Sequence, residues 1–101
     1  MVTEIYRMKV APGKVSAARD WASRIWAQSE KAGSSGTGSV LRSVTGDTNE
    51  VVVLVQYASL AEFEESFKKL RADSGWVAIA RELRESDWIR ESTRQFYETF
   101  E

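Results

Sequence analysis

The run Val51–Val55, which reads "VVVLV", constrains the fold of this chain more than any other feature. Five apolar residues in a row, within the stretch "EVVVLVQY", predict a strand whose two faces are both apolar, because successive side chains of a strand point to opposite sides. A strand of this kind needs cover on both faces. One layer of helices covers only one face, so the sequence predicts that the other face meets something else.

The first third of the chain predicts a strand followed by a helix. Residues 2–10 alternate, with Val2, Tyr6, Met8 and Val10 on one face, and Glu4 interrupts that apolar face. The simplest interpretation of Glu4 is a carboxylate at the surface near the strand end. The segment "APGK" then predicts a corner, because proline stops the strand and glycine adopts the backbone angles of a turn. Helical spacing begins at Lys14, and Gly33 is expected just past the helix end.

The rest of the chain predicts a hairpin, helices and a final strand. "GSSGTG" is typical of a linker, and residues 39–45 and 50–57 are expected to pair around the turn "GDTN". Ser59 and Glu62 form a capping box, and Asp73 or Ser74 is placed to cap a second, short helix. Residues 92–100 are expected to form the last strand, with Phe96 and Phe100 pointing inward to the helices. The buried stripe of the helix after Ser59 is predicted to be Leu60, Phe63, Phe67 and Leu70.

This β-α-β-β-α-β order predicts an α+β, ferredoxin-like fold within one domain, residues 1–101. Four antiparallel strands would form one sheet, with the helices on one face. Val52 and Leu54 would then lie on the bare face. The sequence therefore favours a homodimer, with two sheets packed into a dimeric α+β barrel. The alternative is a monomer that tolerates an exposed patch.

Composition excludes several kinds of chemistry. The chain has no cysteine and no histidine, so thiolate nucleophiles and the usual metal and haem ligands are missing, and we expect no cofactor and no metal site. The net charge is −1, which favours neither nucleic acid nor an anionic membrane as partner. No apolar run is long enough to span a bilayer, and charged residues interrupt the N-terminal segment. We expect a cytoplasmic protein.

Three stretches resemble the dimeric α+β barrel superfamily, and within it NIPSNAP-type domains. They are "EIYRMKVAPGK" at 4–14, "TGDTNEVVVLVQYASLAEFEE" at 45–65 and "ADSGW" at 72–76. The superfamily also includes cofactor-independent monooxygenases and polyketide cyclases. The resemblance implies a homodimer with a central cavity. NIPSNAP-type sequences often carry His and Trp in the third strand, where Val53 and Val55 stand here. Haem degradation through a histidine ligand therefore does not transfer.

Polarity predicts a ligand site on the helix-free face of the sheet. An apolar pocket with guanidinium, amide and phenol groups would suit a planar ligand that bears oxygen, for example an enolate or phenolate. The candidate ligand-binding residues are Arg7, Arg42, Gln56 and Tyr97. Arg42 is placed on this face because an arginine is not expected to face the core.

Each candidate also has a purely structural interpretation. The two arginines can sit in ion pairs or reach solvent, and Tyr97 can be an ordinary interface aromatic. The tryptophans are expected to fill the core and the interface. They are Trp21, Trp26, Trp76 and Trp88.

The sequence identifies no catalytic residue, because it contains no Ser-His-Asp set and no carboxylate pair on the expected cavity face. Two functions follow. One is a protein that binds a small organic ligand, as a cofactor-independent monooxygenase or a polyketide cyclase-like enzyme would. The other is a non-catalytic dimeric interaction domain with a filled barrel.

Overall fold

A computed structural model describes residues 1–100, and its elements follow the predicted order with three helices. The elements are β1 (Val2–Val10), α1 (Val15–Ala32), β2 (Thr37–Arg42), β3 (Glu50–Tyr57), α2 (Leu60–Ala72), α3 (Ser74–Glu85) and β4 (Ile89–Glu98). None of the helices in residues 1–100 is long and apolar enough to cross a bilayer.

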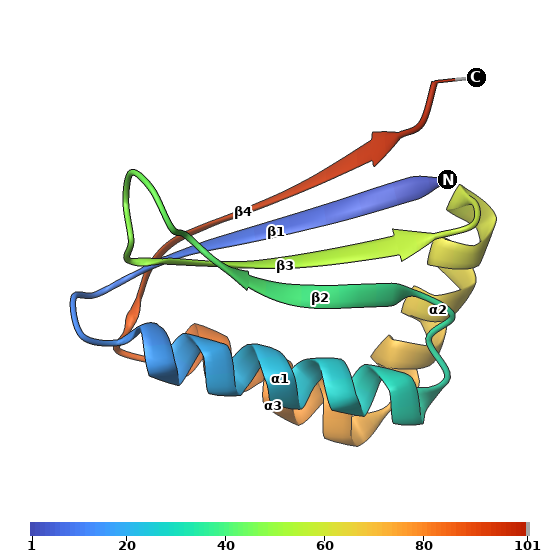
Figure 1. Cartoon of the computed structure of the whole chain (residues 1–101). Coiled ribbons are helices and arrows are strands. Elements are labelled where there is room, and N and C mark those ends of the chain that lie inside the picture. The colour runs from blue at the N-terminus through green and yellow to red at the C-terminus, as the bar shows by residue number, and fades with distance from the viewer. Residues whose placement is uncertain (101) are drawn as a thin grey trace.

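The strands form one antiparallel sheet in the order β2-β3-β1-β4. This order, with β1 and β3 in the centre, confirms the predicted ferredoxin-like fold. All three helices lie on one side of the sheet (Figure 1). α1 and α3 run along the sheet, and α2 stands at the end where β1 begins and β3 ends (Figure 1). One face of the sheet is therefore covered by helices, and we call the other the helix-free face.

The corner between β1 and α1 is the turn that the sequence predicts. The Lys14 N–H donates to the Ala11 carbonyl oxygen at 3.0 Å, and Gly13 has a φ of +80°, which glycine adopts without strain. α1 ends as predicted at Gly33, whose φ is +98°. The Ser34 N–H then donates to the Ser29 carbonyl oxygen at 3.0 Å, which closes the last turn of the helix. This corner directs α1 back under the sheet.

The core lies between the sheet and the helices, and β3 shows how the two faces differ. Val51, Val53 and Val55 are buried on the helix-covered face, while Val52 and Leu54 remain partly exposed on the helix-free face. The two-sided apolarity of this strand is therefore real, and a single chain covers only half of it. The other buried apolar residues of the core cluster are Met8, Val10, Ala18, Trp21, Ala22 and Tyr57.

Several boundaries and burial predictions need correction. β2 begins at Thr37 and ends at Arg42, and β4 covers Ile89–Glu98 rather than 92–100. Phe100, predicted to pack inward, lies beyond the end of β4 and is fully exposed. Leu60 is 51% exposed instead of buried, because it is the first residue of α2, next to the Ser59 cap. The caps themselves are confirmed, since Ser59 accepts from the Glu62 N–H and Asp73 from the Trp76 N–H.

Candidate functional site

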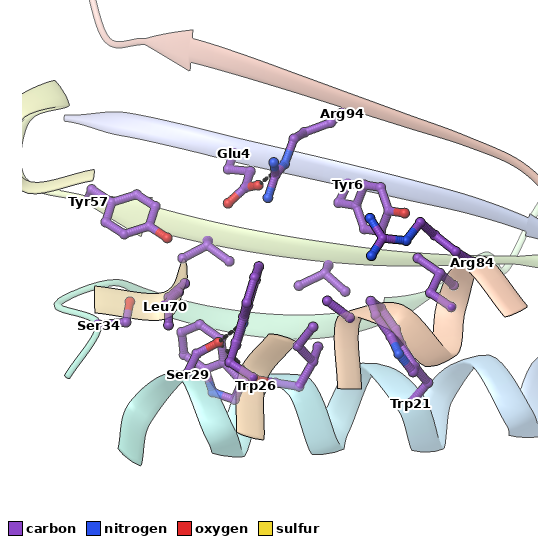
Figure 2. Close-up of a pocket in the computed structure, with 16 residues that line it drawn as sticks. Glu4, Tyr6, Trp21, Trp26, Ser29, Ser34, Tyr57, Leu70, Arg84 and Arg94 are labelled. Carbon is purple, nitrogen blue, oxygen red and sulfur yellow. Dashed lines mark hydrogen bonds and ion pairs between the residues drawn. The ribbon is translucent and has the colours of Figure 1, made fainter. Parts of the chain in front are cut away.

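A cavity of about 320 Å³ lies between the sheet and the helices. Its position differs from the sequence-based prediction, which placed a ligand pocket on the helix-free face. Figure 2 shows side chains entering it from β1, β3 and β4 above and from α1 and α3 below. The aromatic and charged residues that line it are Glu4, Tyr6, Trp21, Trp26, Tyr57, Trp76, Arg84 and Arg94.

Five aromatic side chains contribute to the cavity wall. Trp21 and Trp26 come from α1, Trp76 comes from α3, and Tyr6 and Tyr57 come from the sheet. A hydrogen bond fixes the Trp21 indole, because its Nε1–H donates to the Ile79 carbonyl oxygen at 2.8 Å. The three tryptophans, expected to be simple fillers, thus line a space large enough for a small organic molecule.

Ser29 holds the third indole of this wall in place. The Trp76 Nε1–H donates to Ser29 Oγ at 3.1 Å, and that hydroxyl donates in turn to the Ile25 carbonyl oxygen at 2.8 Å. Two elements far apart in sequence, α1 and α3, are joined here through one buried hydroxyl. The wall is therefore preorganised rather than assembled by a ligand.

Close packing against glycine places Trp26. A Cβ atom at Gly38 would lie 2.6 Å from the Leu54 carbonyl oxygen and 3.2 Å from the Trp26 ring. Only glycine fits between the β3 backbone and this ring, because real Cβ atoms do not approach backbone oxygen so closely. Gly38, the last glycine of "GSSGTG", therefore belongs to β2 and makes room for the Trp26 side chain of the cavity wall.

At the cavity, the buried carboxylate of Glu4 on β1 forms an ion pair with Arg94 on the neighbouring strand β4. Glu4 is 6% exposed, and one of its carboxylate oxygens accepts a hydrogen bond from Arg94 Nε at 2.5 Å. The Arg94 guanidinium also lies 5.6 Å from the centre of the Phe67 ring and 5.8 Å from that of Phe96. The prediction that Glu4 lies at the surface is wrong, because Glu4 shares the helix-covered face of β1 with Val2 and Tyr6 and is compensated there by Arg94.

The Glu4 carboxylate affects a neighbouring phenol. Burial raises the pKa of Tyr57 above its ordinary value of 10.0, and the negative charge of Glu4 raises it further. Hydrogen bonding to Ser34 and the positive charge of Arg94 act in the opposite direction. Tyr57 is therefore a neutral hydroxyl at physiological pH, able to donate or accept a hydrogen bond.

The four residues predicted as ligand-binding are not brought together. Arg7, Gln56 and Tyr97 do lie on the helix-free face, where Thr3 pairs with both Gln56 and Tyr97. Arg7 has its side chain half exposed and lies 3.7 Å from a Glu50 carboxylate oxygen, which fits the ion-pair interpretation of this residue.

Arg42 is on the other side of the sheet. It pairs with Val51, whose side chain is buried under the helices, and directly opposed residues in an antiparallel pair share a face. The rule that an arginine avoids the core failed here because Arg42 ends the edge strand β2 and remains exposed despite its face. None of the four predicted residues lines the cavity.

A signal for the missed residues was present in the sequence. Arg94 is two residues from Phe96, which was expected to point inward, so the period of two places Arg94 inward as well. Glu4 has the inward parity of Val2 and Tyr6 on the first strand. Two opposite charges on the inward faces of two strands predict a buried ion pair once those strands are known to be neighbours.

The cavity can hold a flat apolar body and contact polar substituents. Aromatic walls favour stacking with a planar ring system, and hydroxyl and guanidinium groups can bind its oxygen atoms. Within residues 1–100, no group of three or more Asp or Glu side chains is arranged to hold a metal ion.

The chain is therefore an α+β, ferredoxin-like domain with a cavity between its sheet and helices that aromatic side chains line in part. The NIPSNAP family model matches residues 3–101, and the chain belongs to the NIPSNAP family. No curated protein matches the sequence.

Solved structures share the fold at low sequence identity. A NIPSNAP family protein with unknown function from Agrobacterium tumefaciens is 22% identical, with a TM-score of 0.75 over 96% of this chain and 86% of that one. An uncharacterised NIPSNAP domain protein from Burkholderia xenovorans is 16% identical, with a TM-score of 0.74 over 99% and 95%. A Nitrosomonas europaea protein, provisionally assigned as an antibiotic biosynthesis monooxygenase, is 14% identical, with a TM-score of 0.73 over 100% of both chains.

Proposed function

We propose that this protein binds a planar organic molecule with oxygen substituents in the cavity between its sheet and helices. The observation that carries the proposal is the cavity itself, about 320 Å³ in volume, with aromatic walls and both neutral and charged polar groups. Ligand pockets have this composition: a mostly apolar lining with a few polar groups that fix orientation.

Blocking the cavity tests this proposal directly. Ala80 lines the cavity from α3, while Ala78 on the same helix is exposed and outside it. We expect 2-naphthol and 1,8-dihydroxyanthraquinone to raise the melting temperature of the wild type and of Ala78→Phe. Ala80→Phe should remove that shift, because the added ring occupies the ligand space.

The melting temperatures without ligand serve as the folding control for both variants. Equal stabilisation of Ala80→Phe and Ala78→Phe by the probes would contradict the proposed site. Absence of any shift with a broad panel of flat aromatic compounds would favour the other hypothesis, a non-catalytic interaction domain.

A second candidate is cofactor-independent oxygenation of the bound ligand. Two guanidinium groups line the cavity, those of Arg84 and Arg94, and a guanidinium stabilises the enolate that such a reaction needs. The likeness to the Nitrosomonas europaea protein supports this candidate at the level of the fold. In the test reaction, the methylene carbon of anthrone loses two hydrogen atoms and gains one oxygen atom from O2, and the other oxygen atom leaves as water.

Oxygen uptake decides whether this reaction occurs. We expect one O2 consumed per anthraquinone formed, a rate above the uncatalysed background, and no acceleration by Ala80→Phe. A cyclase-like activity would use the cavity without O2 uptake. Anthrone oxidation at the background rate with wild-type protein would exclude the oxygenase.

We further propose that two copies associate through the helix-free face. Its middle rows carry Ile5, Leu41, Val52 and Leu54, which are partly or largely exposed in one chain. Polar residues border this apolar patch: Thr3 and Gln56 lie beyond the row of Leu54, Arg7 lies beside Val52, and Glu50, the ion-pair partner of Arg7, lies beyond the row of Val52. An apolar centre with a polar rim is the pattern of a protein interface, and a second copy of the same face supplies a matching surface.

Leu54→Asp tests the dimer, because it places an unpaired charge in the centre of this face. We expect light scattering to give a dimeric mass for the wild type and a monomeric mass for Leu54→Asp at tens of micromolar. The matched control is Leu60→Asp, since Leu60 is exposed on α2 and away from the sheet face. A wild-type monomer, or a dimer unchanged by Leu54→Asp, would contradict the proposal.

A further inference from the structure

The cavity carries a net positive charge that its own residues do not neutralise. Three of its lining residues are ionised at neutral pH: Glu4, Arg84 and Arg94. The charges of Glu4 and Arg94 compensate each other through the 2.5 Å contact between Arg94 Nε and the Glu4 carboxylate. Arg84 has neither an ion-pair partner nor a side-chain hydrogen bond among residues 1–100, and so it is the uncompensated charge.

The position of Arg84 in α3 explains why it is unpaired. It lies in the last turn of α3, where the residues four and three positions earlier are Ala80 and Arg81, and the helix ends at Glu85, before it reaches Asp87. Neither can form the helical ion pair that usually holds an exposed arginine. Figure 2 shows the Arg84 side chain extending from α3 toward the sheet. Its guanidinium is therefore available to a group outside the chain.

The two ends of the site differ in what they offer. The Glu4–Arg94 pair and Tyr57 lie on the sheet, while Arg84 enters from α3, on the same helix as the apolar lining residues Ala80 and Leu83. A ligand whose ring system lies among the tryptophans can reach Arg84 with one substituent. A guanidinium binds a carboxylate through two parallel hydrogen bonds, which is the strongest polar contact available there.

We infer that the ligand of this cavity is a planar aromatic carboxylate and that Arg84 is the residue that selects it. This inference rests on the proposed ligand-binding function and narrows it to one chemical class. The aromatic wall binds the ring system, and Arg84 distinguishes an anionic substituent from a neutral one. Because Arg84 is exposed, the carboxylate lies toward the cavity mouth, where bulk water and salt reach it.

The test compares 2-naphthoate with 2-naphthylmethanol, which has the same ring system and no charge, by isothermal titration calorimetry. We expect wild-type protein to bind the carboxylate about ten times more tightly than the alcohol. A hydrogen bond to a charged group changes the dissociation constant by roughly a factor of ten. Raising the salt concentration should weaken binding of the carboxylate alone.

Arg84→Gln should weaken 2-naphthoate binding by about tenfold and leave 2-naphthylmethanol binding unchanged. Arg84→Lys should recover part of the loss, because it restores the charge without the fork of donors. The matched control is Arg81→Gln, an exposed arginine on the same helix that does not line the cavity, and it should bind both compounds as the wild type does.

The outcomes separate the two proposals. If the wild type binds both compounds equally, or if Arg84→Gln and Arg81→Gln have the same effect, the inference about Arg84 is wrong while ligand binding stands. If the wild type binds neither these compounds nor the phenolic probes named above, the proposed function fails and the inference fails with it. Thermal unfolding of each variant without ligand shows whether its fold is intact.

Discussion

The two faces of this one sheet are built from the same strands but carry different chemistry. On the helix-covered face, the central rows hold Tyr6 opposite Val53 and Arg94, and Glu4 opposite Val55 and Phe96. On the helix-free face, the neighbouring rows hold apolar β3 side chains, with charges only toward one end. The covered face buries the Glu4 carboxylate at the cavity, whereas on the free face the Arg7 side chain is half exposed to solvent.

This difference shows how one strand can serve two purposes. Alternate residues of β3 line the cavity, as Val53 and Val55 do, while the residues between them form the proposed interface. The period of two thus separates the ligand site from the association surface within eight residues of chain. Substitutions at adjacent positions of β3 should therefore have unlike effects, which makes the comparison testable.

The largest expected effect comes from Val51→Asp compared with Val52→Asp. Val51 is 1% exposed under the helices, so a carboxylate there has neither water nor a partner and should lower the free energy of unfolding by about 3–5 kcal/mol. Val52 lies opposite Arg7 on the helix-free face, so Val52→Asp should preserve the folded chain while weakening the proposed dimer. Urea denaturation monitored by circular dichroism measures both, and equal losses of stability would contradict the distinction between the faces.

Breaking the Glu4–Arg94 pair should have an intermediate effect on the covered face. Arg94→Met leaves the Glu4 carboxylate buried without its partner, which should lower the free energy of unfolding by about 1–3 kcal/mol. This loss is smaller than that expected for Val51→Asp because the Arg94 side chain is 44% exposed, and water can reach the position that it leaves.

The double variant with Glu4→Gln distinguishes charge from packing. It should be more stable than Arg94→Met alone, because a neutral amide is less costly to bury than a carboxylate. If adding Glu4→Gln instead lowers stability by the same amount as it does in the wild type, the two side chains are not coupled.

The fold was largely predictable from sequence because its signals are local and periodic. The alternation of residues 2–10, the Pro-Gly corner and the Ser59 and Asp73 caps each depend on neighbours in the chain, and the structure contains all of them. The inward and outward faces of β1 and β3 follow from the same period of two. These features required no knowledge of which strands pair.

The cavity was not predictable in the same way, because its lining comes from β1, β3, β4 and all three helices together. Polarity placed Glu4 at the surface, but a charged residue can be buried when a partner on another strand compensates it. Polarity placed Arg42 on the helix-free face, but an arginine on the helix-covered face can stay exposed at a strand end. Whether tryptophans fill a core or surround a space depends on how far apart the sheet and helices stand. Periodicity does not determine that distance.

The smallest effect we predict is a pH dependence that belongs to the covered face. Burial and the charge of Glu4 raise the pKa of Tyr57 in the folded protein above 10.0, while the unfolded chain has the ordinary value. Between those two pKa values the folded state keeps a proton that the unfolded state has lost. The stability that Tyr57 contributes is therefore fully present below pH 10 and is lost as the pH rises through the folded-state pKa.

Tyr57→Phe removes this titration and tests its sign. The difference in unfolding free energy between wild type and Tyr57→Phe should be constant from pH 7 to 9, and above pH 10 it should change in favour of the variant. In a Glu4→Gln background the same comparison should give a smaller change, because the carboxylate is one cause of the raised pKa. Urea denaturation in steps from pH 7 to 11 measures all four proteins. Parallel curves for wild type and Tyr57→Phe across that range would mean that the Tyr57 phenol is as well hydrated in the cavity as in the unfolded chain. The helix-covered face would then not exclude water better than the helix-free face does.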